Sequence, residues 1–137
     1  MYIVFKKTQT CFLERLIKFF TGSDYVHCEV VTKKTHDSFY GYASLPGTGV
    51  CCRWVPYNLD DWEFVKVDPS NSIKEFFSKT KGKKYDYLGS IGIILGCRQN
   101  PNRYFCSEWC SEFLGLTNPS KITPCELHKI LNKEKIE

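Results

Sequence analysis

The sequence predicts an α+β fold in which a small antiparallel sheet packs against helices, within one domain spanning residues 1–137. Three observations support this prediction. The length is that of one ordinary domain, and 42% hydrophobic residues with 15% aromatic residues are enough for a core. Short runs rich in β-branched and aromatic residues end at turn residues. Other segments repeat apolar residues at helical spacing.

Five short runs have the composition of strands, and they cover residues 2–5, 25–32, 39–44, 50–55 and 62–67. The second run is the most informative one. Its period of two places Val26, Cys28 and Val30 on one face, and His27 and Glu29 on the other. A strand that carries a histidine and an acid on the same face is therefore expected inside the sheet.

Helical spacing predicts helices over residues 12–20, from residues 68–70 to about Gly82, from Cys106 to a glycine cap at Gly115, and from residues 123–127 onward. The apolar run 91–96 is expected to be a buried helix or turn, because it is far too short to cross a membrane. The whole chain has no apolar window of eighteen or more residues.

Composition excludes several classes of protein. The formal net charge of +4 reflects a modest excess of lysine, and no nucleic-acid motif accompanies it, so we expect no nucleic-acid partner. The N-terminus lacks the order of a secretory signal, and we expect no integral membrane segment. The expected location is a reducing cytoplasm, unless the protein is exported as part of a larger particle such as a virion.

Eight cysteines are present, but they lie in strand-like or helix-like settings rather than in the loops of a disulfide scaffold, so most are expected to be free thiols. No Cys-x-x-Cys or His-x-x-x-His pair occurs, and we expect no metal and no cofactor. The alternative is a metal site that uses His27, Cys28, or the vicinal pair Cys51 and Cys52, or the pair Cys106 and Cys110.

The candidate nucleophile is Cys106, at the first turn of a predicted helix, where unpaired N–H groups and the helix dipole favour a thiolate. The alternative is a small core residue, which is what we expect of Cys110. Glu108 and Glu112 are expected to face solvent. Of the three histidines, His36 lies in a polar turn and His128 on an exposed or half-buried helix position. His27 lies inside the sheet, where it needs a hydrogen-bond partner.

Two motifs carry a family resemblance. The run Gly82-Lys83-Lys84-Tyr85 followed by Tyr104-Phe105-Cys106-Ser107 resembles the Gly-x-x-Tyr and Phe-x-Cys-Ser signature of NlpC-type cysteine peptidases. Because His27 precedes the cysteine, the order resembles the circularly permuted, papain-like branch of that superfamily. That branch includes YiiX-type amidases, relatives of lecithin:retinol acyltransferase and small phage-encoded proteins.

The resemblance implies a permuted papain-like fold and a thiol-dependent amidase or peptidase that works through a thioester. Cys106 would be the nucleophile and His27 its general base, while Tyr85 and the Cys106 backbone N–H would support the oxyanion. It implies a peptide or another amide as substrate, such as a peptidoglycan stem peptide or a lipid or amino-acid amide. An acyltransferase would use the same cysteine and histidine.

The third catalytic residue departs from the family pattern, which places a His or Glu on the strand after the histidine strand. Residues 39–44 offer no acid, imidazole or amide. Glu29 is our first candidate for orienting the ring of His27, and Tyr42 is the second. Glu29 has an alternative interpretation, as an exposed residue or a lysine's ion-pair partner. The missing acid also leaves open a binding or virion structural protein that keeps the fold with an impaired site.

Overall fold

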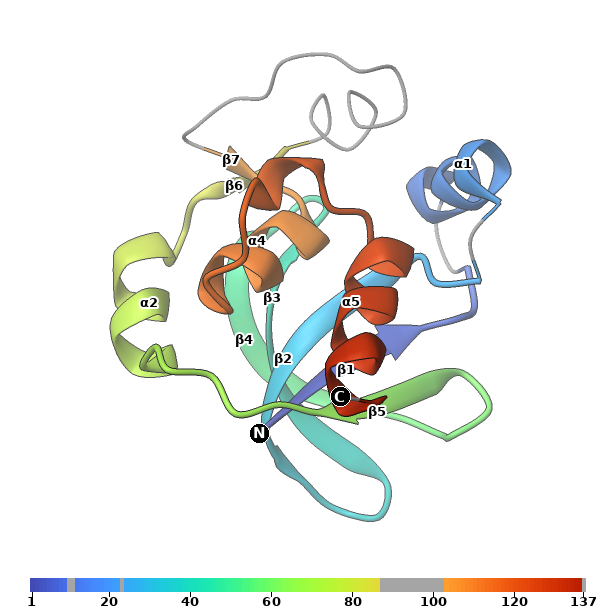
Figure 1. The fold of residues 1–137 in the computed structure, drawn as a ribbon. Helices are drawn as coiled ribbons and strands as arrows, with labels where there is room; N and C mark the ends of the chain where they lie inside the picture. The colour runs from blue at the N-terminus through green and yellow to red at the C-terminus, as the bar shows by residue number, and fades with distance from the viewer. Residues whose placement is uncertain (10–11, 23, 87–102, 137) are drawn as a thin grey trace.

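The computed structural model describes residues 1–9, 12–22, 24–86 and 103–136. Figure 1 shows a strongly bent sheet with α4 and α5 on one side of it, α2 beside β4, and α1 at the end where β2 begins. Strands and helices alternate irregularly along the chain, and the paired strands of the large sheet are all antiparallel, so the predicted α+β class is confirmed.

The large sheet has the strand order β4-β3-β2-β1-β5. Its strands are β1 (Tyr2–Lys6), β2 (His27–Lys34), β3 (Ser38–Leu45), β4 (Gly49–Pro56) and β5 (Trp62–Lys66). All five were predicted from β-branched and aromatic runs, with ends that differ by a residue or two. β2 lies at the centre of the sheet.

The sheet is curled, and its two faces hold two separate clusters of buried residues. The ring of Phe39 on β3 lies 5.1 Å from that of Trp62 and 5.8 Å from that of Phe64, both on β5, although two strands separate β3 from β5 in the sheet. On the concave face, aromatic side chains from β3 and β5 therefore pack directly against one another. The convex face packs against the helices through Phe5, Cys28 and other buried residues.

The helices are α1 (Phe12–Thr21), α2 (Ile73–Thr80), α4 (Cys106–Phe113) and α5 (Pro124–Ile136), with a 3-10 turn η1 at Pro119–Lys121. The predicted start of α2 at residues 68–70 is wrong, because Ser72 is the N-cap and its side chain accepts the backbone N–H of Glu75. The predicted element at 91–96 lies outside the described residues. Among those described, no helix has the length and apolar character that crossing a membrane requires.

α4 is held on several sides, which fixes the position of its first residue. Trp109 is fully buried and donates its indole N–H to Thr80 Oγ1 at 2.9 Å. Ser107 donates its hydroxyl to the backbone oxygen of Ile122 at 2.6 Å. Burying an aromatic residue of this size contributes a few kcal/mol. The start of α4 is therefore anchored to α2 on one side and to the approach to α5 on the other.

A parallel pair of two-residue strands, β6 (Lys84–Tyr85) and β7 (Arg103–Tyr104), leads into α4, and the sequence patterns did not predict it. β6 follows a segment joined to β4, since Val50 donates its N–H to the oxygen of Lys83 at 2.8 Å. Gly49 permits this approach. Its φ is +83°, and a Cβ there would lie 2.2 Å from the same Lys83 oxygen.

Candidate active site

Cys106 is the first residue of α4, as the helical spacing predicted. Its side chain is 2% exposed and belongs to the cluster on the convex face of the sheet, beside Cys28 and Cys110. Phe105 precedes it in an extended conformation and provides no side-chain cap. Cys106 therefore lies at the N-terminus of α4, which is the positive end of the helix dipole.

His27 is the first residue of β2, and its ring meets Cys106 at that end of the strand. The charges of the His27 ring and the Cys106 sulfur attract one another, which raises the pKa of His27 and lowers that of Cys106. The residue is 7% exposed, and its ring lies edge-on to Trp62 with 6.3 Å between centroids. The structure thus brings together the two residues that the sequence nominated as nucleophile and base.

Glu29 lies on the concave face with His27, at full burial. Its Oε2 is 3.5 Å from Nε2 of His27, an ion-pair contact rather than a hydrogen bond. On its other side Glu29 accepts two hydrogen bonds from the guanidinium of Arg53 on β4, one of them from Nη2 to Oε2 at 3.1 Å. The alternative interpretations of Glu29, an exposed residue or a lysine's partner, are wrong, because it is buried and its cationic partners are His27 and Arg53.

The electrostatics of the pair favour the charged forms. Burial alone would lower the pKa of His27, but the Cys106 thiolate and then Glu29 raise it to about 10. The pKa of Cys106 falls well below its ordinary value, because a hydrogen bond from Cys28 and the charge of His27 outweigh the opposing effect of burial. Both shifts favour a thiolate at Cys106 and an imidazolium at His27.

The Glu29 carboxyl is also ionised. Burial alone would raise its pKa, yet His27 and Arg53 lower it to about 2. A buried carboxylate needs such partners, since an isolated charge in the interior is very costly. Sequence reasoning missed Arg53. The available signal was its position inside the predicted strand 50–55, where a cation needs an acidic partner if it is buried.

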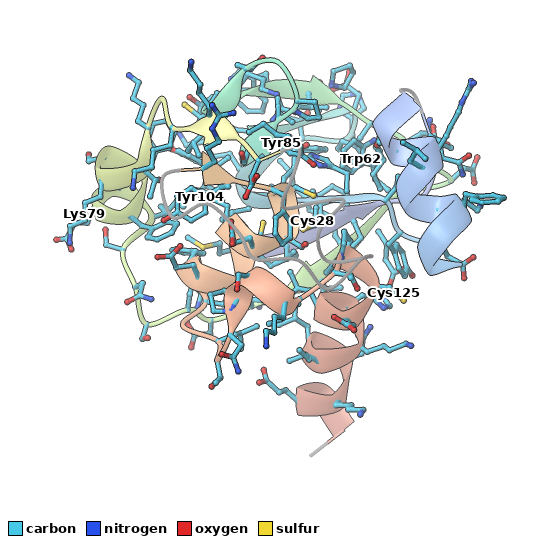
Figure 2. The ribbon with its side chains drawn as sticks, turned by 90° about the horizontal axis from the view of Figure 1, so that it is seen from above. Cys28, Trp62, Lys79, Tyr85, Tyr104 and Cys125 are labelled. Atoms are coloured by element: carbon cyan, nitrogen blue, oxygen red, sulfur yellow. The ribbon has the colours of Figure 1, made fainter. Side chains whose placement is uncertain are left out.

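Cys28 is the second residue that sequence reasoning missed. It points to the convex face, its pKa is raised well above the ordinary value by burial, and its thiol hydrogen-bonds to Cys106. In Figure 2, Cys28 lies near the middle of the view, between Tyr104 before α4 and Cys125 in α5. Adjacent residues on β2 therefore reach Cys106 from both sides of the strand, Cys28 as a hydrogen-bond donor and His27 as a cation.

The two tyrosine candidates differ in position. Tyr85 is 3% exposed and pairs with Tyr104 in the short ladder that leads into α4. Tyr42 is half-buried and packs edge-on to Tyr40 and to Phe77 of α2, with ring centroids 5.5 and 5.0 Å away. The carboxylate beside His27 is supplied by Glu29, whereas the aromatic rings that Tyr42 contacts lie on β3 and α2.

Other polar groups have different surroundings from those expected. Glu108 is 6% exposed, so its predicted solvent exposure is wrong. Burial, with the charges of Asp86 and Glu112, raises its pKa to about 8. Glu112 is exposed as predicted. His128 is half-buried, and its Nε2 lies 2.9 Å from Oε1 of Glu63, which ties α5 to β5.

Within the ranges that the structure describes, no group of three or more histidine, cysteine or acidic side chains is arranged to hold a metal ion. Each cysteine described there is a free thiol. A surface cavity of about 390 Å³ lies at the far end of α4, between the segment 66–70 and α5, and its lining includes Leu114, Leu116 and Leu131. That cavity contains none of the residues around Cys106.

The chain matches no protein-family model, no curated protein and no solved structure.

Proposed function

We propose that the protein is a thiol-dependent hydrolase, an amidase or peptidase, in which Cys106 attacks a carbonyl and forms a thioester. The observation that carries the proposal is the interaction of the Cys106 sulfur, at the start of α4, with the ring of His27. A buried thiolate–imidazolium pair is the resting state that such a nucleophile requires.

The proposed reaction has two steps. The thiolate of Cys106 adds to the substrate carbonyl, and the oxyanion is received by N–H groups at the start of α4, with Tyr85 as a further candidate. His27 then gives its proton to the leaving amine, which breaks the amide and leaves a thioester. In the second step His27 takes a proton from water, and the resulting hydroxide adds to the carbonyl carbon of the thioester. The C–S bond then breaks, which releases the acid and restores the Cys106 thiolate beside protonated His27.

The fold and location that belong to this proposal are those of a permuted, papain-like NlpC-type domain in the cytoplasm or in a virus particle. Three features support it: the histidine strand precedes the cysteine helix, β6 carries the tyrosine, and Glu29 supplies a carboxylate to His27. The proposed substrates are peptidoglycan stem peptides or lipid or amino-acid amides. An acyltransferase differs only in passing the acyl group to an amine or alcohol.

The proposal is tested by measuring the pH dependence of alkylation by iodoacetamide at each cysteine, with peptide mapping by mass spectrometry. The pH midpoint of the Cys106 reaction should lie well below that of an ordinary thiol, which is about 8.5. Cys110, on the same helix and fully buried, is the matched control. His27→Ala should move the Cys106 midpoint upward. An ordinary midpoint for Cys106 in the unaltered protein would refute the proposal.

A second candidate function is a binding protein that keeps this arrangement without turnover, and the 2% exposure of Cys106 favours it. An activated ester such as p-nitrophenyl acetate separates the two. A hydrolase forms an acetyl-thioester at Cys106 and then releases acetate, whereas a binding protein forms no adduct there.

A further inference from the structure

Arg53 is joined to the candidate site through Glu29, across three strands of the sheet. Its guanidinium donates to both carboxylate oxygens of Glu29, and Nη2 lies 3.1 Å from Oε2. The same Oε2 lies 3.5 Å from Nε2 of His27. One carboxylate oxygen therefore bridges two cations, and the ion pairs run from β4 to β2 and on to Cys106.

Gly41 makes this contact possible. It lies on β3, the strand between Glu29 and Arg53, and it pairs with Arg53 across the β3–β4 ladder. A Cβ at residue 41 would lie 2.9 Å from Oε1 of Glu29 and 2.9 Å from the ring of Phe39. Any side chain there would force the carboxylate or the ring to move. The absence of a side chain on β3 opens the space in which Glu29 meets Arg53.

We infer that Arg53 is a positioning residue, which holds the buried Glu29 carboxylate in place so that it orients His27 toward Cys106. The inference rests on the proposed function. Glu29 is fully buried, while the Arg53 side chain is 33% exposed, so the arginine keeps part of its hydration and neutralises a carboxylate that has none. The planar guanidinium also fixes both oxygens, which a lysine does not do.

Several titratable groups lie around the Glu29–Arg53 ion pair, and a pH titration of the protein responds to all of them. They are His27 on β2 and the thiols of Cys51 and Cys52 on β4, with Cys106 on α4 beyond His27. A merely structural ion pair between Arg53 and Glu29 would affect unfolding but not the titration of the His27 ring. The positioning role predicts a change in that titration.

The test follows the His27 ring signals by NMR through a pH titration, together with mapped alkylation of Cys106. Arg53→Gln should lower the His27 midpoint by at least about one pH unit and raise the Cys106 midpoint, and Arg53→Lys should give a smaller shift. Gly41→Ala keeps every charge and should shift both midpoints in the same directions. Arg15→Gln, at an exposed position on α1, is the control and should shift neither.

A double variant covers the case in which Arg53→Gln leaves Glu29 without a partner and does not fold. Glu29→Gln removes the buried charge, and adding Arg53→Gln to it should produce no further shift of either midpoint. Unchanged midpoints in Arg53→Gln and Gly41→Ala, in a protein whose Cys106 is reactive at acid pH, would overturn the role of Arg53. An ordinary Cys106 midpoint in the unaltered protein would instead overturn the proposed function.

Discussion

The Glu29→Gln substitution should change how the stability of the protein depends on pH. In the folded protein the pKa of Glu29 is about 2, against 4.5 for the free side chain. This difference corresponds to about 3 kcal/mol of folding free energy. Because the folded pKa is the lower one, the contribution is complete above pH 4.5 and is lost as the pH falls toward 2. Glutamine does not ionise, so the variant lacks this term at every pH.

The assay is urea unfolding followed by tryptophan fluorescence, repeated at a series of pH values on the acid side of neutrality. The difference in unfolding free energy between the unaltered protein and Glu29→Gln should shrink below pH 4.5, by at most about 1.4 kcal/mol per pH unit. Glu134→Gln, at an exposed position on α5, is the matched control and should give a curve parallel to that of the unaltered protein. A parallel curve for Glu29→Gln would show that the buried carboxyl titrates normally, and would refute the reasoning.

Two further predictions concern the thiolate and the imidazolium. Cys28→Ala removes the hydrogen bond that lowers the pKa of Cys106 most, so the pH midpoint of Cys106 alkylation should rise by about one unit, whereas Cys125→Ala should leave it unchanged. An unmoved midpoint in Cys28→Ala would assign the shift to His27 alone. In the unaltered protein, the His27 ring should stay protonated past neutral pH and lose its proton with a midpoint of about 10, measured by NMR. A midpoint near 6.5 would contradict the ion pair.

The parts of the site that depend on local periodicity were predictable from the sequence. Alternation along residues 25–32 placed His27 and Glu29 on one face, and helical spacing placed Cys106 at the start of α4. Arg53 was not predictable in the same way. Its contact with Glu29 depends on the strand order of the sheet and on the space above Gly41, and neither is encoded in a short window.

Other errors have similar physical causes. Glu108 was expected at the surface because an amphipathic helix normally keeps one face in water. α4 is instead buried at seven of its eight residues, so its polar residues are covered too. The β6–β7 ladder joins two segments distant in sequence through two residues each, too few to show any period. The start of α2 was wrong because Pro69 and Ser70 also have the composition of a helix start, while Ser72 makes the cap.

The consecutive residues His27, Cys28 and Glu29 have a consequence for how the site tolerates change. Their contacts alternate between the two sides of the sheet, so the pairing of β2 with β1, in which Phe5 lies opposite Cys28, decides which group each side receives. A slip of one residue would turn the imidazole and the carboxylate to the helices and the thiol to the aromatic interior. A change that slips this pairing by one residue should therefore abolish the contacts on both sides of the sheet together, even with every side chain still present.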